Sequence, residues 1–217
     1  MYIVKRKLII AFLFVIPCGS VSIKAQNVDR SADITDLYNV SNIAKGELFV
    51  QSQYSPTSYV FLGKTPHSSS YRTTIGFVFL STYGVFDTHF SYSMRWHPRL
   101  AYRYSKRDQG GKLKTVYGWG LDPIGLVKSQ PLSSSTHFET ALFGGFTFVS
   151  HDFPTDKGRR LNFTFEAQLT LKQIIDSKYI ISIGTSYHHI SNAQMGSENP
   201  GIDSLYMIAK LSYLFTN

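Results

Sequence analysis

The sequence lacks any hydrophobic run long enough to cross a membrane as a helix. Near its start, residues 8–16 form an unbroken apolar stretch of nine residues. Nine residues of helix rise about 14 Å, well short of the roughly 30 Å hydrocarbon core of a bilayer. No apolar stretch after residue 25 is long enough for a spanning helix either. The sequence after residue 25 therefore excludes membrane-spanning helices, and the N-terminal stretch is short for one.

The short apolar stretch is typical of a secretory signal peptide. Lys5, Arg6 and Lys7 precede it, Pro17 ends it, and the small residue Ala25 comes before a polar segment. A charged start, a short apolar core and a small residue at the cleavage site are the three parts of such a signal. We expect residues 1–25 to be removed on export, in preference to the alternative of a membrane-anchoring helix.

Cysteine is nearly absent as well. Cys18, the one cysteine of the 217 residues, lies inside the predicted signal peptide. Its predecessor is Pro17, whereas a cysteine that receives a lipid normally follows a small residue, so we expect no lipid anchor. Cleavage after Ala25 leaves a chain with no disulfide, no thiol nucleophile and no cysteine-ligated metal.

The excess of positive charge is smaller than the whole sequence suggests. The formal net charge is +8, but four of the 22 Lys and Arg residues lie in the predicted signal peptide, which has no acidic residue. The exported part thus carries 18 cations against 14 anions, a balance of +4. Such a modest excess of cations does not single out nucleic acid, since a lipid that carries phosphates would be an equally suitable partner. We expect no nucleic-acid partner.

In much of the exported part, apolar and polar residues alternate along the sequence. From Leu161 to Lys172, odd positions are apolar and even positions are polar or charged. This period of two predicts a β-strand with two unlike faces. Residues 90–104 repeat the pattern. The predicted apolar face there includes Met94, Trp96, Leu100, Tyr102 and Tyr104, and the predicted polar face includes Arg95, Arg99 and Arg103.

Eight segments have this pattern: residues 46–54, 72–83, 89–105, 113–128, 136–149, 160–174, 178–192 and 203–216. Turn-forming residues join them, as in the run 176–178. An even number of hairpin-linked strands can close into a barrel, and closure leaves no unpaired edge in lipid. The predicted fold is all-β, an eight-stranded antiparallel transmembrane β-barrel over residues 46–217, preceded by an N-terminal extension, residues 26–45.

A soluble, lipocalin-like barrel is the alternative, with the apolar side chains inside. The period alone does not distinguish the two. The polar set includes Arg95, Glu139, Glu166 and Lys172, which could pair across a narrow lumen, while the apolar set is large and aromatic. A belt of such residues is typical of a lipid-facing surface, which favours the membrane barrel.

The residues best suited to chemistry lie in the last predicted hairpin. His189 and Ser191 are two apart, so they share one face of a strand, and Asp203 has the apolar parity of the next strand. All three are predicted to face lipid at the outer end of the hairpin. An imidazole can activate a hydroxyl, and a carboxylate can fix the imidazole's tautomer. The alternative is that these three polar residues have no catalytic role and only contact lipid headgroups at the strand ends. Against it, ionisable side chains that face lipid cost free energy, so they are rarely found there without a function.

The segments around these residues resemble a known family. His-Ile-Ser-Asn-Ala at 189–193 and Asn-Pro-Gly-Ile-Asp at 199–203 are similar to the signature of the outer-membrane lipid A 3-O-deacylases, the PagL-like or acyloxyacyl hydrolase-related proteins. The strings at 117–125 and 159–165 also resemble strands of that family. The resemblance implies an eight-stranded barrel in the bacterial outer membrane, with its active site on the lipid-facing surface.

The resemblance also implies roles for the site residues. His189 is then the general base, Ser191 the nucleophile, and Asp203 orients His189, at a position where the family enzyme carries Glu. Asn192 and Asn199 match positions associated with oxyanion stabilisation, to which amide donors are suited. The implied activity is that of a serine carboxylic-ester hydrolase that removes an acyl chain, expected to be the 3-O-linked one, from lipid A of lipopolysaccharide, without a metal or organic cofactor. The alternative is a non-catalytic outer-membrane barrel that acts as a scaffold or adhesin.

Overall fold

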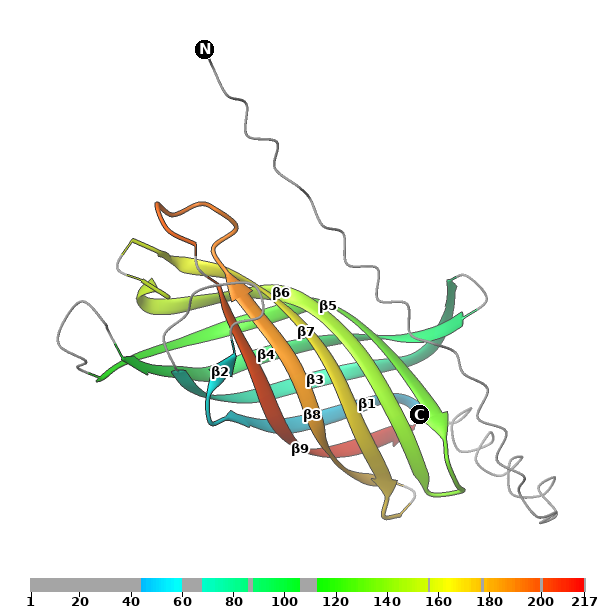
Figure 1. The fold of residues 1–217 in the computed structure, drawn as a ribbon. Coiled ribbons are helices and arrows are strands. Elements are labelled where there is room, and N and C mark those ends of the chain that lie inside the picture. Colours follow the sequence, from blue (N-terminus) through cyan, green and yellow to red (C-terminus); the bar gives the residue numbers. More distant parts are fainter. Residues whose placement is uncertain are drawn as a thin grey trace.

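The chain folds into a closed antiparallel β-barrel (Figure 1). The computed structural model describes residues 44–59, 68–85, 88–105, 113–155, 157–176, 178–199 and 201–216. Within these ranges the strands are β1 (Ala44–Ser55), β2 (Ser58–Tyr59), β3 (Ser68–Val85), β4 (Thr88–Ser105), β5 (Leu113–Pro131), β6 (Thr136–Phe153), β7 (Arg159–Ile174), β8 (Tyr179–Ser191) and β9 (Ile202–Thr216). Each long strand pairs with the next, and β1 pairs with β9 to close the barrel.

The eight long strands confirm the predicted fold class. They overlap all eight predicted segments, and the two-residue strand β2 adds a short pairing with β9. The described residues contain no helix of the length and hydropathy needed to span a membrane. The predicted signal peptide and nearly all of the predicted N-terminal extension, residues 1–43, lie outside the described residues.

The outer end of the barrel can be assigned from its connections. Residues 86–87, 132–135 and 175–178 join strands at one end, whereas residues 106–112 and 192–201 are longer connections at the other. Outer-membrane barrels have short periplasmic turns and longer extracellular loops. The β8–β9 connection, in orange in Figure 1, therefore lies at the outer end.

One of the short turns has the predicted polar chemistry. The backbone N–H groups of Lys178 and Tyr179 donate to Asp176 Oδ1 at 2.7 and 2.9 Å. These two hydrogen bonds lower the pKa of the Asp176 carboxyl, because they stabilise its charged form. The turn thus brings β7 directly into β8 at the periplasmic end.

The outside of the wall is apolar and the inside is polar. Along β7 and β8, exposed side chains alternate with buried ones. The exposed set includes Phe163, Phe165, Leu169, Leu171, Ile181 and Ile183. The buried set includes Thr164, Glu166, Gln168, Thr170, Lys172 and Ser182. This orientation confirms the membrane barrel over the soluble alternative, because a soluble barrel would bury the apolar set.

Ion pairs fill the middle of the lumen. Glu166 binds the guanidinium groups of Arg72 and Arg95, the latter at 2.7 Å. Arg95 also binds Asp122 at 2.5 Å, and Asp122 lies 2.8 Å from Nε2 of His97. These side chains are buried, so the charges are stable only because each has an opposite partner.

A second group of charges lies nearer the periplasmic end. Lys172 binds Glu47 at 2.6 Å and Glu139 at 3.0 Å. Lys210 binds Glu139 at 2.7 Å. The predicted inward positions of Glu139, Glu166 and Lys172 are thereby confirmed, and the lumen is filled by side chains, as expected for eight strands.

The predicted faces of β4 are wrong beyond Pro98. The strand β4 holds one extra residue in both pairings, between Trp96 and Arg99 against β3 and between His97 and Leu100 against β5. This bulge reverses the alternation, since a one-residue shift moves every following side chain to the other face. Leu100, Tyr102 and Tyr104 are therefore buried inside, whereas Arg99 and Arg103 are exposed outside. Proline causes no lost ladder bond at such a site, because a bulge already interrupts the pairing.

Candidate active site

The predicted site residues are held by an apolar cluster inside the outer end of the barrel. Ile190 of β8 and Ile202 of β9 are fully buried in this cluster. The other members are Leu100, Tyr102, Tyr104, Val116, Val149 and Phe153. Because side chains alternate along a strand, burying Ile190 and Ile202 turns His189, Ser191 and Asp203 to the outside.

His189 and Asp203 are direct neighbours across the β8–β9 pairing. Nδ1 of His189 lies 2.7 Å from Oδ1 of Asp203. An ionised carboxylate accepts hydrogen bonds only, so Nδ1 carries the proton and donates it to Asp203. In the neutral imidazole, the other ring nitrogen, Nε2, then carries no proton and can accept one. This is the tautomer that a general base needs.

Asp203 faces lipid by parity and yet is almost completely buried. It is 2% exposed, and the side chain of His189 is 26% exposed. On its other side, Asp203 pairs with Tyr59 of β2. The carboxylate is therefore shielded from its surroundings, while the imidazole beside it remains partly accessible.

Tyr187 is a site residue that sequence reasoning missed. Its hydroxyl donates to Oδ1 of Asp203 at 2.6 Å, the same oxygen that accepts from His189. Tyr187 lies two residues before His189 on β8, so the period of two already placed the pair on one face. The missing information was the strand register, which puts Leu205 opposite Tyr187 and brings Asp203 within reach.

Ser191 is the last residue of β8 and shares the outward face of His189. It is partly buried and pairs with Phe163 of β7. Among the described residues no hydrogen bond joins Ser191 Oγ to His189. The structure thus brings His189 and Asp203 into contact and places Ser191 two residues after His189 on β8.

The two asparagines have unlike positions in the β8–β9 loop. Asn192 is completely buried, and its Nδ2 donates to the carbonyl of Glu198 at 2.7 Å. Its backbone N–H donates to Oδ1 of Asn199 at 2.9 Å. Asn199 is only partly buried. Asn192 therefore stabilises the loop through these two hydrogen bonds. The bond to Oδ1 of Asn199 also fixes the orientation of the Asn199 side-chain amide.

The loop is also attached to the β6–β7 connection. Arg159 Nε donates to the carbonyl of Met195 at 2.9 Å, and Lys157 lies 3.3 Å from Glu198. At the far end of the loop, Gly201 has a φ of +66°, and a Cβ there would lie 3.0 Å from Cε1 of His189. Glycine suits both constraints, since it has no Cβ and tolerates positive φ.

The described residues contain no group of three or more His, Cys, Asp or Glu side chains arranged to hold a metal ion. The chemistry available at this site is that of a carboxylate, an imidazole, a serine hydroxyl and asparagine amides. These are the groups of a nucleophilic acyl-transfer site.

A family model described as lipid A 3-O-deacylase (PagL) matches residues 80–212, more than half of the 217-residue chain. The chain belongs to the PagL family. As a PagL-family member it is an outer-membrane lipid A deacylase, which agrees with the apolar outer wall of its barrel. The matched range includes His189, Ser191 and Asp203.

Solved structures resemble this PagL-family barrel at low sequence identity. The crystal structure of the outer membrane enzyme PagL has a TM-score of 0.54 and 16% identity, and the match covers 75% of this chain and 97% of that chain. Neisserial surface protein A matches with a TM-score of 0.47 and 11% identity over 79% of this chain and 98% of that chain. Outer membrane protein OprG from Pseudomonas aeruginosa matches with a TM-score of 0.48 and 10% identity over 80% and 98%. No curated protein matches the sequence significantly.

Proposed function

We propose that this chain hydrolyses the 3-O-linked acyl ester of lipid A by a Ser/His/Asp mechanism. The observation that carries the proposal is the 2.7 Å contact between His189 and the buried Asp203 on the lipid-facing side of the wall. Ionisable side chains at lipid-facing positions are costly and mark functional sites. Here the pair lies at the outer end of β8 and β9, where lipid headgroups meet acyl chains.

The proposed reaction is a two-step acyl transfer. Ser191 Oγ attacks the ester carbonyl while Nε2 of His189 takes the hydroxyl proton, and the imidazolium is stabilised by Asp203. Collapse of the tetrahedral intermediate breaks the ester bond, and the departing sugar hydroxyl receives the proton from His189. Water then attacks the acyl-serine with His189 again as the base, which releases the fatty acid and restores Ser191.

Substrate binding is expected to complete the Ser191–His189 contact. Hydrogen bonds between a nucleophile and its base are often long before the substrate is bound, and they tighten in the complex. His189 is already in the required tautomer, because its Nδ1 is committed to Asp203.

Asn199 is the better oxyanion candidate of the two asparagines. The Nδ2 group and the backbone N–H of Asn192 both donate within the loop. Asn199 uses its carbonyl oxygen as an acceptor, which leaves its NH2 group as a donor at a partly exposed position. A preorganised amide donor is what a developing oxyanion requires. Asn192 then positions Asn199 by holding its carbonyl.

Mass spectrometry of lipid A tests the proposal directly. The folded protein in detergent is incubated with lipid A, beside Ser191→Ala, His189→Gln and the control Ser197→Ala, which changes an exposed serine of the same loop. We expect loss of one hydroxyacyl mass with the wild type and the control, and none with the two site variants. Lipid A that lacks the 3-O chain should remain unchanged. Release by Ser191→Ala would refute the nucleophile, and no release by the folded wild type would favour the scaffold alternative.

A further inference from the structure

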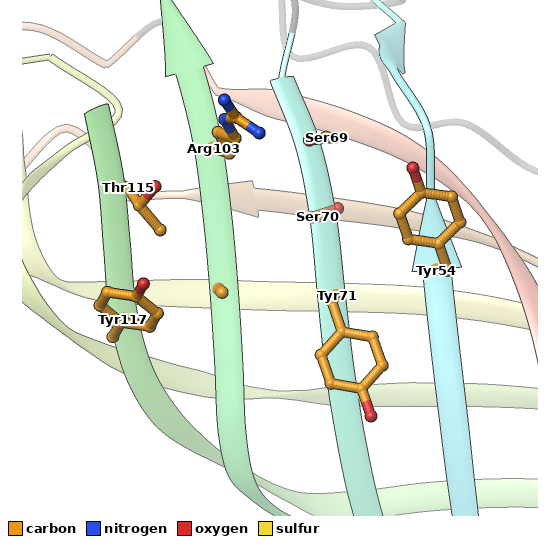
Figure 2. A pocket seen from close by; sticks show the side chains of 8 residues that line it. Tyr54, Ser69, Ser70, Tyr71, Arg103, Thr115 and Tyr117 are labelled. Carbon is orange, nitrogen blue, oxygen red and sulfur yellow. The ribbon is translucent and has the colours of Figure 1, made fainter. Parts of the chain in front are cut away.

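A hollow lies on the outer wall of the barrel, away from the candidate active site (Figure 2). It has a volume of about 440 Å³ and extends over β1, β3, β4 and β5. The strand register explains its shape. Tyr54 pairs with Tyr71, Tyr71 with Ala101, and Ala101 with Tyr117, so the four residues form one row across four strands. Ala101 interrupts this row of tyrosines and leaves a gap between two aromatic rings.

A cation lies beside the gap. Arg103 follows Ala101 by two residues on β4, so it has the same outward face and lies about 6.6 Å nearer the loops. Its neighbours across the strands are Ser69 on β3 and Thr115 on β5. Figure 2 shows Arg103 between the strands that carry these two residues. A guanidinium flanked by two hydroxyl-bearing residues thus stands at the outer edge of the hollow.

The outward position of Arg103 is a consequence of the bulge at Pro98. Without the extra residue, Arg103 would face the lumen, as the regular alternation predicts. Among the described residues no salt bridge joins Arg103 to a carboxylate. Arg99, on the same strand, is exposed as well. Within the described part of the wall, this positive charge therefore has no acidic partner, and it complements an anionic headgroup.

The hollow is separate from the hydrolytic site. The His189–Asp203 pair lies on β8 and β9. The hollow begins at Tyr54 on β1, which pairs with Met207 of β9 four residues beyond Asp203, and it extends away from the pair to β5. Three strand spacings of about 4.8 Å put Arg103 about 14 Å around the wall from Asp203. The tyrosines lie near the outer ends of their strands, where aromatic girdles meet the headgroup region.

We propose that this hollow binds the phosphorylated headgroup of a second lipid A molecule in the outer leaflet, distinct from the molecule being hydrolysed. Arg103 pairs with a phosphate, for which the guanidinium fork is suited, and Ser69 and Thr115 donate further hydrogen bonds. The sugar or the first part of an acyl chain occupies the gap at Ala101. The inference does not depend on the catalytic residues.

Binding is measured by native mass spectrometry in detergent, in a Ser191→Ala background so that the lipid is not consumed. Arg103→Gln removes the cation, and Ala101→Phe fills the gap without changing the charge. Arg99→Gln is the matched control, since it removes an exposed arginine of the same strand that does not line the hollow. We expect the first two variants to weaken one lipid A binding event about tenfold or more, as for loss of a charge-assisted hydrogen bond, and the control to leave it unchanged.

Several outcomes would overturn the inference. Equal weakening by Arg99→Gln and Arg103→Gln would indicate diffuse attraction of anions rather than a site. Equal binding of dephosphorylated lipid A would remove the role of the phosphate, and equal binding of phosphatidylglycerol would assign the hollow to phospholipids. In the background with Ser191 intact, Arg103→Gln should deacylate lipid A within twofold of the wild type. A parallel loss of deacylation would instead make the hollow part of the substrate site. The unheated gel mobility of each variant shows that it is folded.

Discussion

Replacing Asp203 by Asn should slow deacylation about a thousandfold. The substitution keeps the size of the side chain and, through its carbonyl, an acceptor for the donors at 2.6 and 2.7 Å from Tyr187 and His189. What disappears is the negative charge beside the imidazolium that forms in the transition state. Two unit charges about 4 Å apart at an effective dielectric constant of about 20 attract by about 4 kcal/mol. Each 1.36 kcal/mol changes a rate tenfold, so the loss corresponds to about three orders of magnitude.

The assay is the rate of fatty-acid release from lipid A, measured under single-turnover conditions so that product release does not mask the chemical step. Asp203→Glu should retain much more activity than Asp203→Asn, because it keeps the charge. Asp176→Asn, which changes the same functional group at the periplasmic turn, is the control and should retain full activity. If Asp203→Asn kept more than a tenth of the wild-type rate while folded, Asp203 would not stabilise the imidazolium and the catalytic argument would fail.

Three further predictions concern the support of the site and the wall. Tyr187→Phe should lower kcat about tenfold with little change in KM, because it removes the hydroxyl that holds Asp203 and leaves the lipid-facing surface intact; a change in KM alone would contradict this positioning role. Glu166→Gln should lower the free energy of unfolding by about 3–5 kcal/mol, since Arg72 loses its buried carboxylate and Arg95 keeps only Asp122. Urea unfolding in lipid vesicles would show whether the network contributes. Ile183→Arg should cost about 2–4 kcal/mol in the same assay, because Ile183 is 61% exposed to lipid, and Tyr179→Arg, nearer the membrane boundary, should cost less.

The fold could be predicted because its determinants are local. An alternation of polar and apolar residues defines a strand wherever it occurs, and eight such segments separated by turn residues leave little choice but hairpin pairing. The side that faces lipid followed from charge, since Glu139, Glu166 and Lys172 are stable only where they can pair. The same period of two predicts that His189, Ser191 and Asp203 share one face.

Other features depend on contacts between strands, and the sequence alone did not determine them. The bulge at Pro98 is defined only by the register of β4 against both of its neighbours, and it decides whether Arg103 faces the lumen or the membrane. The hydrogen bond from Tyr187 to Asp203 and the unlike positions of Asn192 and Asn199 come from the β8–β9 register and the packing of the loop.

The row of tyrosines interrupted by Ala101 likewise involves four strands from separate parts of the chain. Periodicity along one strand says which face a side chain occupies, but not which side chain of another strand lies beside it. That second kind of information is set by turn lengths, bulges and closure of β1 on β9, each of which acts across the whole barrel. The sequence by itself therefore determined the strands, the hydrolytic candidates and, except in β4 beyond Pro98, the lipid-facing side. The tertiary structure decided which of them touch, because only the closed barrel sets the register.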